Sequence, residues 1–320
     1  MRGVTEPCSL TINVSVNSSR LDVFFNTIKS VVKGQEHNVK LLLTGFFSRG
    51  HVLLEGIPGT GKTTLSLAFS KLLGLEFKRI QGTSDMLPAD ITGAFVPQKN
   101  DGKLVFLKGP IFTDVLLVDE INRMNPRTQS ALLEAMEERQ VTVEGKTYAL
   151  SSLFFVIATQ NPSESYGTFP LPASQLDRFM MRIQINRVSE DVERKILRDE
   201  HLRDKIKDLE AIFKREEVYR MISNAGRVKV GSEIEDYLIS LAHAIRSHPV
   251  FLDELSTRAL LHLRDAARAF AYIEGRDYVI PFDVKNVLEP VILHRIGLHL
   301  TYQEKKKLLD EIKESVEPPI

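Results

Sequence analysis

The sequence predicts an α/β core built around a parallel sheet and followed by an all-helical domain. Short apolar runs recur as far as about residue 187, each ending at glycine or at acidic or amide residues, and helical segments separate them. Continuous apolar runs of this length are typical of strands that are buried on both faces of a parallel sheet. Beyond residue 187 such runs stop and amphipathic helical patterns dominate, so we place the domain boundary there.

The composition excludes several classes of protein. Lys plus Arg and Asp plus Glu number 42 each in the 320 residues, so the chain lacks the overall positive field of a dedicated nucleic-acid binder. The single cysteine, Cys8, excludes an intramolecular disulfide and a metal site built from cysteines. No apolar run approaches the ~18–20 residues of a membrane span, and no apolar segment typical of a signal peptide follows the start. We therefore expect a cytoplasmic protein without a membrane span.

The core is expected to open with two helices, a strand and a third helix. Residues 1–19 are rich in Ser, Thr, Asn and Val without helical spacing, and we interpret them as a loose tail. Apolar residues recur with helical spacing from Leu21 to Val32, and a second apolar helix is expected from Glu36 to Phe47. HVLLEG (51–56) is an apolar run that stops at glycine, and TTLSLAFSKLLG (63–74) indicates a helix that ends at glycine. The order of strand, glycine-rich turn and helix is typical of a nucleotide-binding α/β unit.

Four further strands and one helix complete the sheet layer of the core, which we assign to residues 20–187. The strands are FKRIQG (77–82), DVLLVDE (114–120), LFFVIATQN (153–161) and MMRIQIN (180–186). Asn125 followed by Pro126 marks the start of the helix, which runs to about Arg139, because Asn is a favoured N-cap and Pro is favoured at the first helical position.

Two hairpins and a helical domain are also expected. Turn residues at Asn100-Asp101-Gly102 and at Glu144-Gly145 lie between alternating segments, which is typical of hairpins. In the helical domain, residues 188–320, a capping box at Ser232 and Glu235 marks one helix start and Ser256 marks another.

One segment matches a phosphate-binding loop. GIPGTGKT (56–63) fits G-x-x-x-x-G-K-[ST] without a mismatch, and a chance glycine-rich turn is disfavoured because a strand and a helix flank it. Glycines let backbone N–H groups converge on phosphate oxygens, the lysine reaches the β- and γ-phosphates, and the Thr63 hydroxyl ligates magnesium. The candidate ATP-binding residues here are Gly56, Ile57, Pro58, Gly59, Thr60, Gly61, Lys62, Thr63 and Thr64.

VLLVDE (115–120) supplies two carboxylates at the end of an expected strand. Asp119 is expected to ligate the same metal ion as Thr63, and Glu120 to take a proton from, or orient, the attacking water. A strand that simply ends in acidic loop residues is the alternative. The phosphate loop in the same chain favours the catalytic interpretation.

Three further polar residues are candidates. Asn161 ends the next strand, where it would position the water or simply form a turn before proline, and the order of motifs favours the first. Arg178 would form an ion pair with Asp177 or reach a neighbouring subunit's γ-phosphate as an arginine finger, and spacing does not separate the two. Arg258 opens a helix of the second domain and, on spacing alone, is a surface residue.

Together these motifs resemble the MoxR-type members of the AAA+ ATPase superfamily. The resemblance covers residues 31 to about 284 in the expected order, and its segments are VVKGQEHNVKLLL, HVLLEGIPGTGKT, RIQGTSDMLPADITG, GPIFTDVLLVDEINRMNPRTQSALLEAMEERQVTVEG, FFVIATQNP, FPLPASQLDRF and LSTRALLHLRDAARAFAYIEGRDYVIPFDV. Two positions depart from the pattern. Thr60-Gly61 stands where many members have Leu-Ala, and Lys33 stands where a small residue is common.

The resemblance implies an AAA+ core with a helical lid, ATP and magnesium as ligands, and rings, usually hexamers, with ATP at subunit interfaces. By matching positions, Asn161 resembles sensor 1, Arg178 the arginine finger acting in trans, and Arg258 the sensor 2 arginine, which we expect to contact the γ-phosphate of its own subunit. Val32 and Gln35 resemble the segment that lines the adenine pocket. The two hairpins are similar to insertions that face substrate.

The resemblance also implies a chaperone-like remodeller or maturation factor for partner proteins, often proteins with a von Willebrand factor A domain. A nucleic-acid-translocating motor is the first alternative, but its hairpins need basic tips and residues 140–151 offer Glu144 beside Lys146. A magnesium-chelatase-type motor is a sibling of the main interpretation. A nucleotide-gated scaffold is disfavoured by the complete set of catalytic candidates, and a small-molecule kinase would leave Arg178 and Arg258 unexplained.

Overall fold

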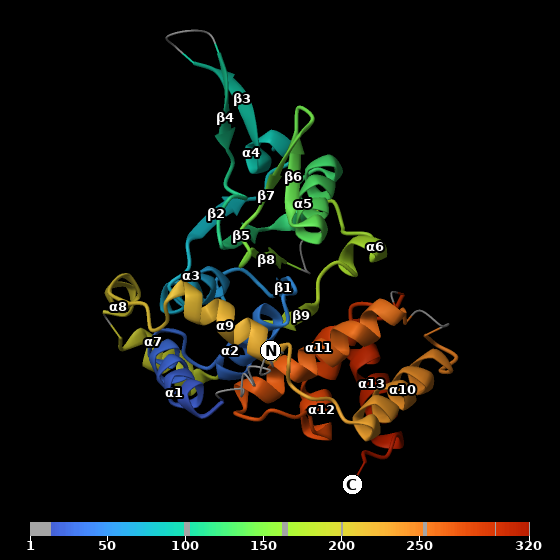
Figure 1. Ribbon diagram of the computed structural model, residues 1–320. Coiled ribbons are helices and arrows are strands. Elements are labelled where there is room, and N and C mark those ends of the chain that lie inside the picture. Colours follow the sequence, from blue (N-terminus) through green and yellow to red (C-terminus); the bar gives the residue numbers. More distant parts are fainter. Residues whose placement is uncertain are drawn as a thin grey trace, which may run out of the picture.

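The computed structural model describes residues 14–98, 103–161, 166–199, 201–251, 255–297 and 299–319. Its centre is a parallel five-stranded sheet in the order β2-β5-β8-β1-β9 (Figure 1). The strands are β1 (Val52–Glu55), β2 (Phe77–Gln81), β5 (Val115–Asp119), β8 (Phe155–Gln160) and β9 (Met181–Gln184). Each lies within one of the five apolar runs, so the predicted parallel sheet is confirmed.

Alternation along the central strands divides the core into two layers. Val115 and Leu117 of β5 belong to the larger apolar cluster, whereas Leu116 and Val118 belong to the smaller one on the other face. Successive strand side chains point to opposite faces, so a strand covered on both faces is apolar throughout. The edge strands β2 and β9 contain half-buried residues, which matches the polar letters in FKRIQ and MRIQ.

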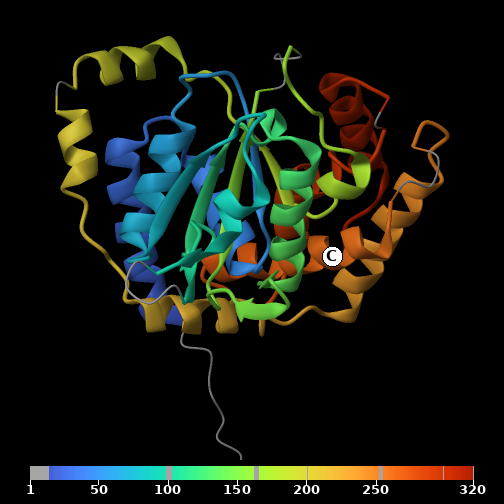
Figure 2. The same ribbon diagram turned by 90° about the horizontal axis from the view of Figure 1, so that it is seen from above.

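Helices cover both faces of this sheet. Helices α1 (Val14–Val31), α2 (Glu36–Phe47) and α3 (Lys62–Leu72) cover one face, and α5 (Pro126–Glu138) covers the other (Figure 2). The α5 start is as predicted, because the Asn125 side chain accepts a hydrogen bond from the Thr128 N–H at 3.0 Å.

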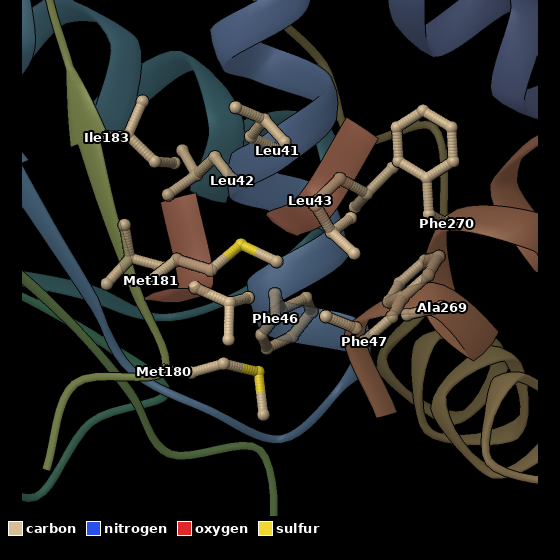
Figure 3. Packing of buried hydrophobic residues seen from close by; sticks show 14 of the residues in the cluster. Leu41, Leu42, Leu43, Phe46, Phe47, Met180, Met181, Ile183, Ala269 and Phe270 are labelled. Atoms are coloured by element: carbon tan, nitrogen blue, oxygen red, sulfur yellow. The ribbon is translucent and has the colours of Figure 1, made fainter. Parts of the chain in front are cut away.

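Helix α2 is buried on two sides. Figure 3 shows its leucine and phenylalanine side chains directed toward β9 on one side and toward α11 (Thr257–Ile273) on the other. This explains the nearly unbroken apolar sequence LLLTGFF. A Cβ at Gly45 would lie 2.5 Å from Cγ2 of Val52, so glycine allows α2 to approach the sheet this closely.

Two antiparallel hairpins project from the core on the side away from the C-terminal helices (Figure 1). They are β3 (Gly93–Pro97) with β4 (Leu104–Lys108), and β6 (Gln140–Val143) with β7 (Lys146–Ala149); the short helix α4 (Pro88–Thr92) precedes the first. Glu144 and Gly145 have φ of 49° and 73°, the left-handed values that a tight hairpin turn requires. The predicted turn at Asn100, Asp101 and Gly102 lies outside the described residues.

The C-terminal part is helical, as predicted. The lid consists of α10 (Ser232–Arg246), α11, α12 (Pro281–Ile292) and α13 (Tyr302–Ser315). Helix α6 (Ala173–Leu176) lies between β8 and β9 in the sequence. Helices α7 (Glu190–Leu197), α8 (Leu202–Lys207) and α9 (Arg215–Ala225) follow β9 and precede the lid, so the exact boundary at residue 187 stays a prediction. Within the described residues no helix combines the length and the apolar character needed to cross a membrane.

Two local expectations differ from the structure. Helix α1 begins at Val14, inside the segment expected to be a loose tail over residues 1–19, and Arg20 anchors it by an ion pair with Glu217 of α9 and by stacking on Phe213. These contacts hold the helix at the residue that precedes its apolar stripe, which begins at Leu21. The expected capping box at Ser232 is also wrong, because Gly231 occupies the N-cap and the side chains make no cap there.

Candidate active site

The phosphate loop joins β1 to α3 at the carboxyl end of the sheet. Gly59 and Gly61 have φ of 82° and 85°, in the left-handed region that glycine adopts most readily, and among the described residues no heavy atom lies within 4 Å of a Cβ built on either. The loop therefore presents open backbone at the N-terminus of α3, where an anion is stabilised by free N–H groups and the helix dipole. Gly56 serves packing instead, since its Cβ would lie 2.4 Å from the carbonyl oxygen of Ile185.

Lys62 lies across this loop. Its Nζ donates hydrogen bonds to the carbonyl oxygens of Gly56 at 2.7 Å and Ile57 at 2.9 Å. Burial lowers the pKa of the Lys62 ammonium, while the carboxylates of Asp119 and Glu120 oppose that shift. The ammonium is thus held between the loop and the two acidic residues.

Asp119 ends β5 beside Thr63, as predicted. Its side chain is 8% exposed, and Oδ2 accepts from Thr63 Oγ1 at 3.4 Å and from Arg79 Nε at 2.6 Å. Oδ1 accepts from Thr159 Oγ1 at 3.2 Å. A hydroxyl and a carboxylate are the oxygen donors that Mg²⁺ prefers, so these two residues fit a magnesium ion.

Glu120 follows in a left-handed conformation, with φ 56° and ψ 54°. Such a conformation is uncommon outside glycine and is often found at functional sites. The Glu120 N–H donates to Thr159 Oγ1 at 3.0 Å, and Oε2 accepts from Gln81 Nε2 at 2.9 Å and pairs with Arg123 Nε at 2.9 Å. The carboxylate is therefore fixed in place at the edge of the phosphate loop.

The sequence motifs did not predict the residues that hold these carboxylates, namely Arg79, Gln81, Arg123 and Thr159. Arg79 and Gln81 are two apart on β2, so they lie on one face of that strand, and Arg79 Nη2 donates to Gln81 Oε1 at 3.2 Å. The polar residues Arg79 and Gln81, two apart in an otherwise partly apolar strand, could have indicated a polar face of β2. Their role can be interpreted only once β2 is known to pair with β5, where Gln81 lies opposite Asp119.

Two cavities meet at the phosphate loop. The first, of about 360 Å³, is lined by Pro58 to Thr64, by Asp119 and Glu120, and by Asn161. The second, of about 590 Å³, is lined by Val32, Gln35 and residues 57–61 of the loop. Of the described candidates for ATP binding, Gly56 is the one that lines neither cavity.

The second cavity has mostly apolar walls and a fixed polar rim. Val32 is 6% exposed, and Gln35 donates through Nε2 to the carbonyl oxygen of Asn186 at 3.1 Å. Lys33, the departure from the family pattern, pairs with Asp199 at 2.6 Å. Hydrogen bonds from Lys33 and Lys205 lower the pKa of Asp199 to about 2. The Lys33 ammonium is thus bound to the segment after α7.

Arg178 and Arg258 lie together elsewhere. Both line a third cavity of about 300 Å³, in which no described residue of the phosphate loop takes part. Arg178 pairs with Glu137 at 2.7 Å, whereas Asp177 pairs with Arg295 at 2.7 Å and, more loosely, with Arg258 at 3.7 Å. The Asp177–Arg178 pair considered as an alternative is therefore not formed. The expected contact of Arg258 with its own phosphate site is not formed either, because α11 begins beside the end of α5.

Comparisons with known proteins agree with this architecture. Residues 51–181 match the family model described as the ATPase family associated with various cellular activities (AAA), and residues 243–316 match the AAA lid domain. A crystal structure of a Cytophaga hutchinsonii protein assigned as an ATPase has a TM-score of 0.82 and 33% identity, covering 97% of this chain and 100% of that one. The fold and the site thus define an AAA ATPase.

Full-length relatives narrow the family. The chain is 37% identical to Chaperone MoxR1 of Mycobacterium tuberculosis, over 90% of this chain and 77% of that protein. It is 33% identical to Protein MoxR of Paracoccus denitrificans, over 88% of this chain and 90% of that protein. It is 38% identical to the uncharacterized protein YeaC of Bacillus subtilis, over 92% of this chain and 93% of that protein. The chain belongs to the MoxR family of AAA ATPases, and its enzymatic activity is ATP hydrolysis.

Proposed function

We propose that the chain works as a ring-forming ATPase that remodels or matures protein partners, with ATP bound between neighbouring subunits. One observation carries the proposal. The phosphate loop, Asp119 and Glu120 line one pair of cavities, while Arg178 and Arg258 line another, so one chain alone offers an incomplete hydrolytic site. A second copy that places its arginines against the open phosphate cavity would complete it, and the resemblance to ring-forming relatives suggests a hexamer.

The residues take the following roles in this proposal. Val32 and Gln35 contact the adenine, and the loop residues Gly59 to Lys62 bind the phosphates through N–H groups and the ammonium. Thr63 and Asp119 hold magnesium, which when bound neutralises charge on the β- and γ-phosphates. Asn161 orients the attacking water.

Glu120 accepts the proton of that water as general base. Its hydrogen bond from Gln81 fixes one carboxylate oxygen and leaves the other for the water. The arginines of the neighbour then stabilise the negative charge that develops on the transferred phosphoryl group. In this proposal Arg258 acts in trans beside Arg178, which replaces the expectation of a contact within one subunit.

The client is proposed to be a protein, such as one with a von Willebrand factor A domain, and the hairpins β3–β4 and β6–β7 are proposed to face it. The reason is the MoxR resemblance together with the outward position of both hairpins (Figure 1). At the β6–β7 turn Glu144 stands beside Lys146, so the tip carries no excess of positive charge for gripping nucleic acid, which disfavours the motor on nucleic acid. A cytoplasmic location stays a prediction.

An ATP-trapped variant tests this function. Glu120→Gln, loaded with ATP, should retain a protein client in pull-down, and the same variant with ADP or the Lys62→Ala variant with ATP should not. Retention of DNA or RNA in place of protein would support the nucleic-acid motor. Equal recovery in all three samples would contradict an ATP-dependent client cycle.

A further inference from the structure

The third cavity contains a carboxylate shared by two arginines. Glu137, near the end of α5, contacts Arg178 Nη1 through Oε2 at 2.7 Å and Arg258 Nη2 through Oε1 at 3.2 Å. Arg178 comes from the segment before β9 and Arg258 from the first turn of α11, so one side chain joins the core to the lid. Arg178 Nη1 also donates to the carbonyl oxygen of Leu133 at 3.1 Å, one turn earlier in α5.

The backbone around Arg178 is held independently. The Arg295 guanidinium, 3% exposed, donates to the carbonyl oxygens of Asp177 at 3.2 Å, Phe179 at 2.7 Å and Met180 at 3.2 Å. These bonds fix the chain on both sides of Arg178. What remains free is the Arg178 side chain, and its direction is set by α5 through Glu137 and Leu133.

The other charged groups of the cavity do not replace Glu137. Asp177 is bound by Arg295 at 2.7 Å and reaches Arg258 only at 3.7 Å, and the cavity's other carboxylate, Asp265, pairs with Arg264 at 2.8 Å. Arg139 donates to the carbonyl oxygens of Phe154 at 3.0 Å and Arg49 at 2.5 Å. Without Glu137, the guanidinium groups of Arg178 and Arg258 would repel each other across one small cavity, and each would gain rotamers.

We propose that Glu137 is a positioning residue, whose carboxylate holds Arg178 and Arg258 as a pair aimed at the nucleotide of the neighbouring subunit. The inference rests on the proposed action of the two arginines in trans. Because both belong to the face that a subunit offers to its neighbour, the loss of Glu137 should impair that face and leave the subunit's own phosphate loop intact.

The test uses turnover in mixed assemblies. Alone, Glu137→Ala should assemble and bind ATP with wild-type affinity in calorimetry, while its turnover falls by about 10²-fold, the scale of a misplaced catalytic group. The turnover of Glu137→Gln, which keeps the shape of the side chain but not its charge, should lie between that of wild type and that of Glu137→Ala. Glu138→Ala is the matched control, since Glu138 is the next residue, is exposed, and forms no ion pair among the described residues.

Mixing variant subunits then shows whether the defect of Glu137→Ala lies in its arginine face or in its own phosphate loop. Subunits with Lys62→Ala carry an intact arginine face, so adding them should restore turnover to Glu137→Ala subunits. The double variant Lys62→Ala/Glu137→Ala should fail to activate Arg178→Ala subunits, whereas Lys62→Ala/Glu138→Ala should succeed. A merely structural role would weaken ATP binding at the variant's own loop and would not show this one-sided rescue.

The outcomes separate the positioning role of Glu137 from the action of the arginines in trans. If Glu137→Ala turns over within about twofold of wild type or faster, while Arg178→Ala is inactive and rescued by Lys62→Ala, the positioning role is overturned and the action in trans stands. Lost ATP binding without rescue overturns it too, in favour of a structural role. Failure of Lys62→Ala to rescue Arg178→Ala, with both assembled, would overturn the action in trans and with it this inference.

Discussion

At the scale of single residues, the environment of Glu120 sets its chemistry. Its backbone is held in a left-handed conformation at the end of β5, its N–H is bound by Thr159, and one carboxylate oxygen is bound by Gln81 and Arg123. A general base must present a free carboxylate oxygen at a fixed position. These contacts meet that requirement without blocking the second oxygen.

Replacing this carboxylate should separate binding from turnover. Glu120→Gln keeps the hydrogen-bonding shape and loses the base, so we expect unchanged ATP affinity and a fall in turnover of ~10²–10⁴-fold. Calorimetry measures the ATP affinity, and a steady-state phosphate-release assay measures the turnover. Glu138→Gln serves as the surface control, and turnover of Glu120→Gln within a few-fold of wild type would remove Glu120 from the role of base.

Residues that are adjacent in sequence were predictable, and those brought together by strand order were not. The phosphate loop and the pair Asp119-Glu120 are each contiguous, so the sequence alone makes them candidates, and the structure places them around one cavity. Arg79 and Gln81 act on that pair from β2, and their role depends on β2 being the neighbour of β5. The location of Arg258 depends on how the lid packs, which no local pattern encodes.

At the scale of helices and strands, burial explains both what was predictable and what was not. The apolar runs locate all five strands of the sheet because the central ones are covered on both faces. Helices α7 and α8 are short and polar, with no buried side chain in α7, so their apolar stripes are too weak to place them from sequence. Helix α2 is apolar and largely buried, and its bounds, Glu36 and Phe47, were predicted to the residue.

The close approach of α2 to the sheet gives a stability prediction. Gly45→Ala adds a Cβ 2.5 Å from Val52 Cγ2, so we expect a loss of about 1–3 kcal/mol in the free energy of unfolding, the usual range for overpacking. Gly226→Ala is the matched control, because its Cβ would meet the nearest atom at an ordinary 3.6 Å. Chemical denaturation measures both, and equal stability of the two variants would contradict the close packing.

Buried histidines link the elements and make the fold sensitive to mild acid. His51 joins α5 to β8 through Met136 O and the Val156 N–H, and burial lowers its pKa to about 3. Burial and Arg295 lower the pKa of His262 to about 4, and burial places the pKa of His294 well below its usual value. Each is neutral in the fold and takes up a proton on unfolding below about pH 6.5.

Stability should therefore fall as the pH drops from 6.5 to 5. The unfolded chain binds more protons than the folded one in this window, and each such histidine contributes a slope that rises to about 1.4 kcal/mol per pH unit at the acid end. Denaturation at pH 7, 6 and 5 measures the slope, and His51→Gln should reduce it even if it lowers stability at pH 7. A free energy of unfolding that is constant across this window would contradict neutral burial of these side chains.

At the scale of the whole molecule, the chain presents two different faces. One carries the open phosphate loop with Asp119 and Glu120, and the other carries Arg178 and Arg258 around Glu137. If these two different faces meet, as proposed, the assembly is head-to-tail and closes into a ring when the rotation allows it. The lid segment after α12 holds the chain around Arg178 through Arg295, so in the proposed assembly a change in lid orientation would move the arginines relative to a neighbour's nucleotide.

The central claim is that hydrolysis needs the phosphate loop of one subunit and the arginines of the next. The direct test is the ATPase rate of mixtures of Arg178→Ala and Lys62→Ala, each inactive alone, at concentrations where light scattering shows that the oligomer forms. Arginine fingers contribute ~10³–10⁵-fold to turnover in well-studied systems, so the signal stands far above background. We expect a rate that rises to a maximum at intermediate mixing ratios, because mixed interfaces pair an intact loop with an intact Arg178. A rate that stays at background at every ratio, with both variants assembled together, would contradict the account.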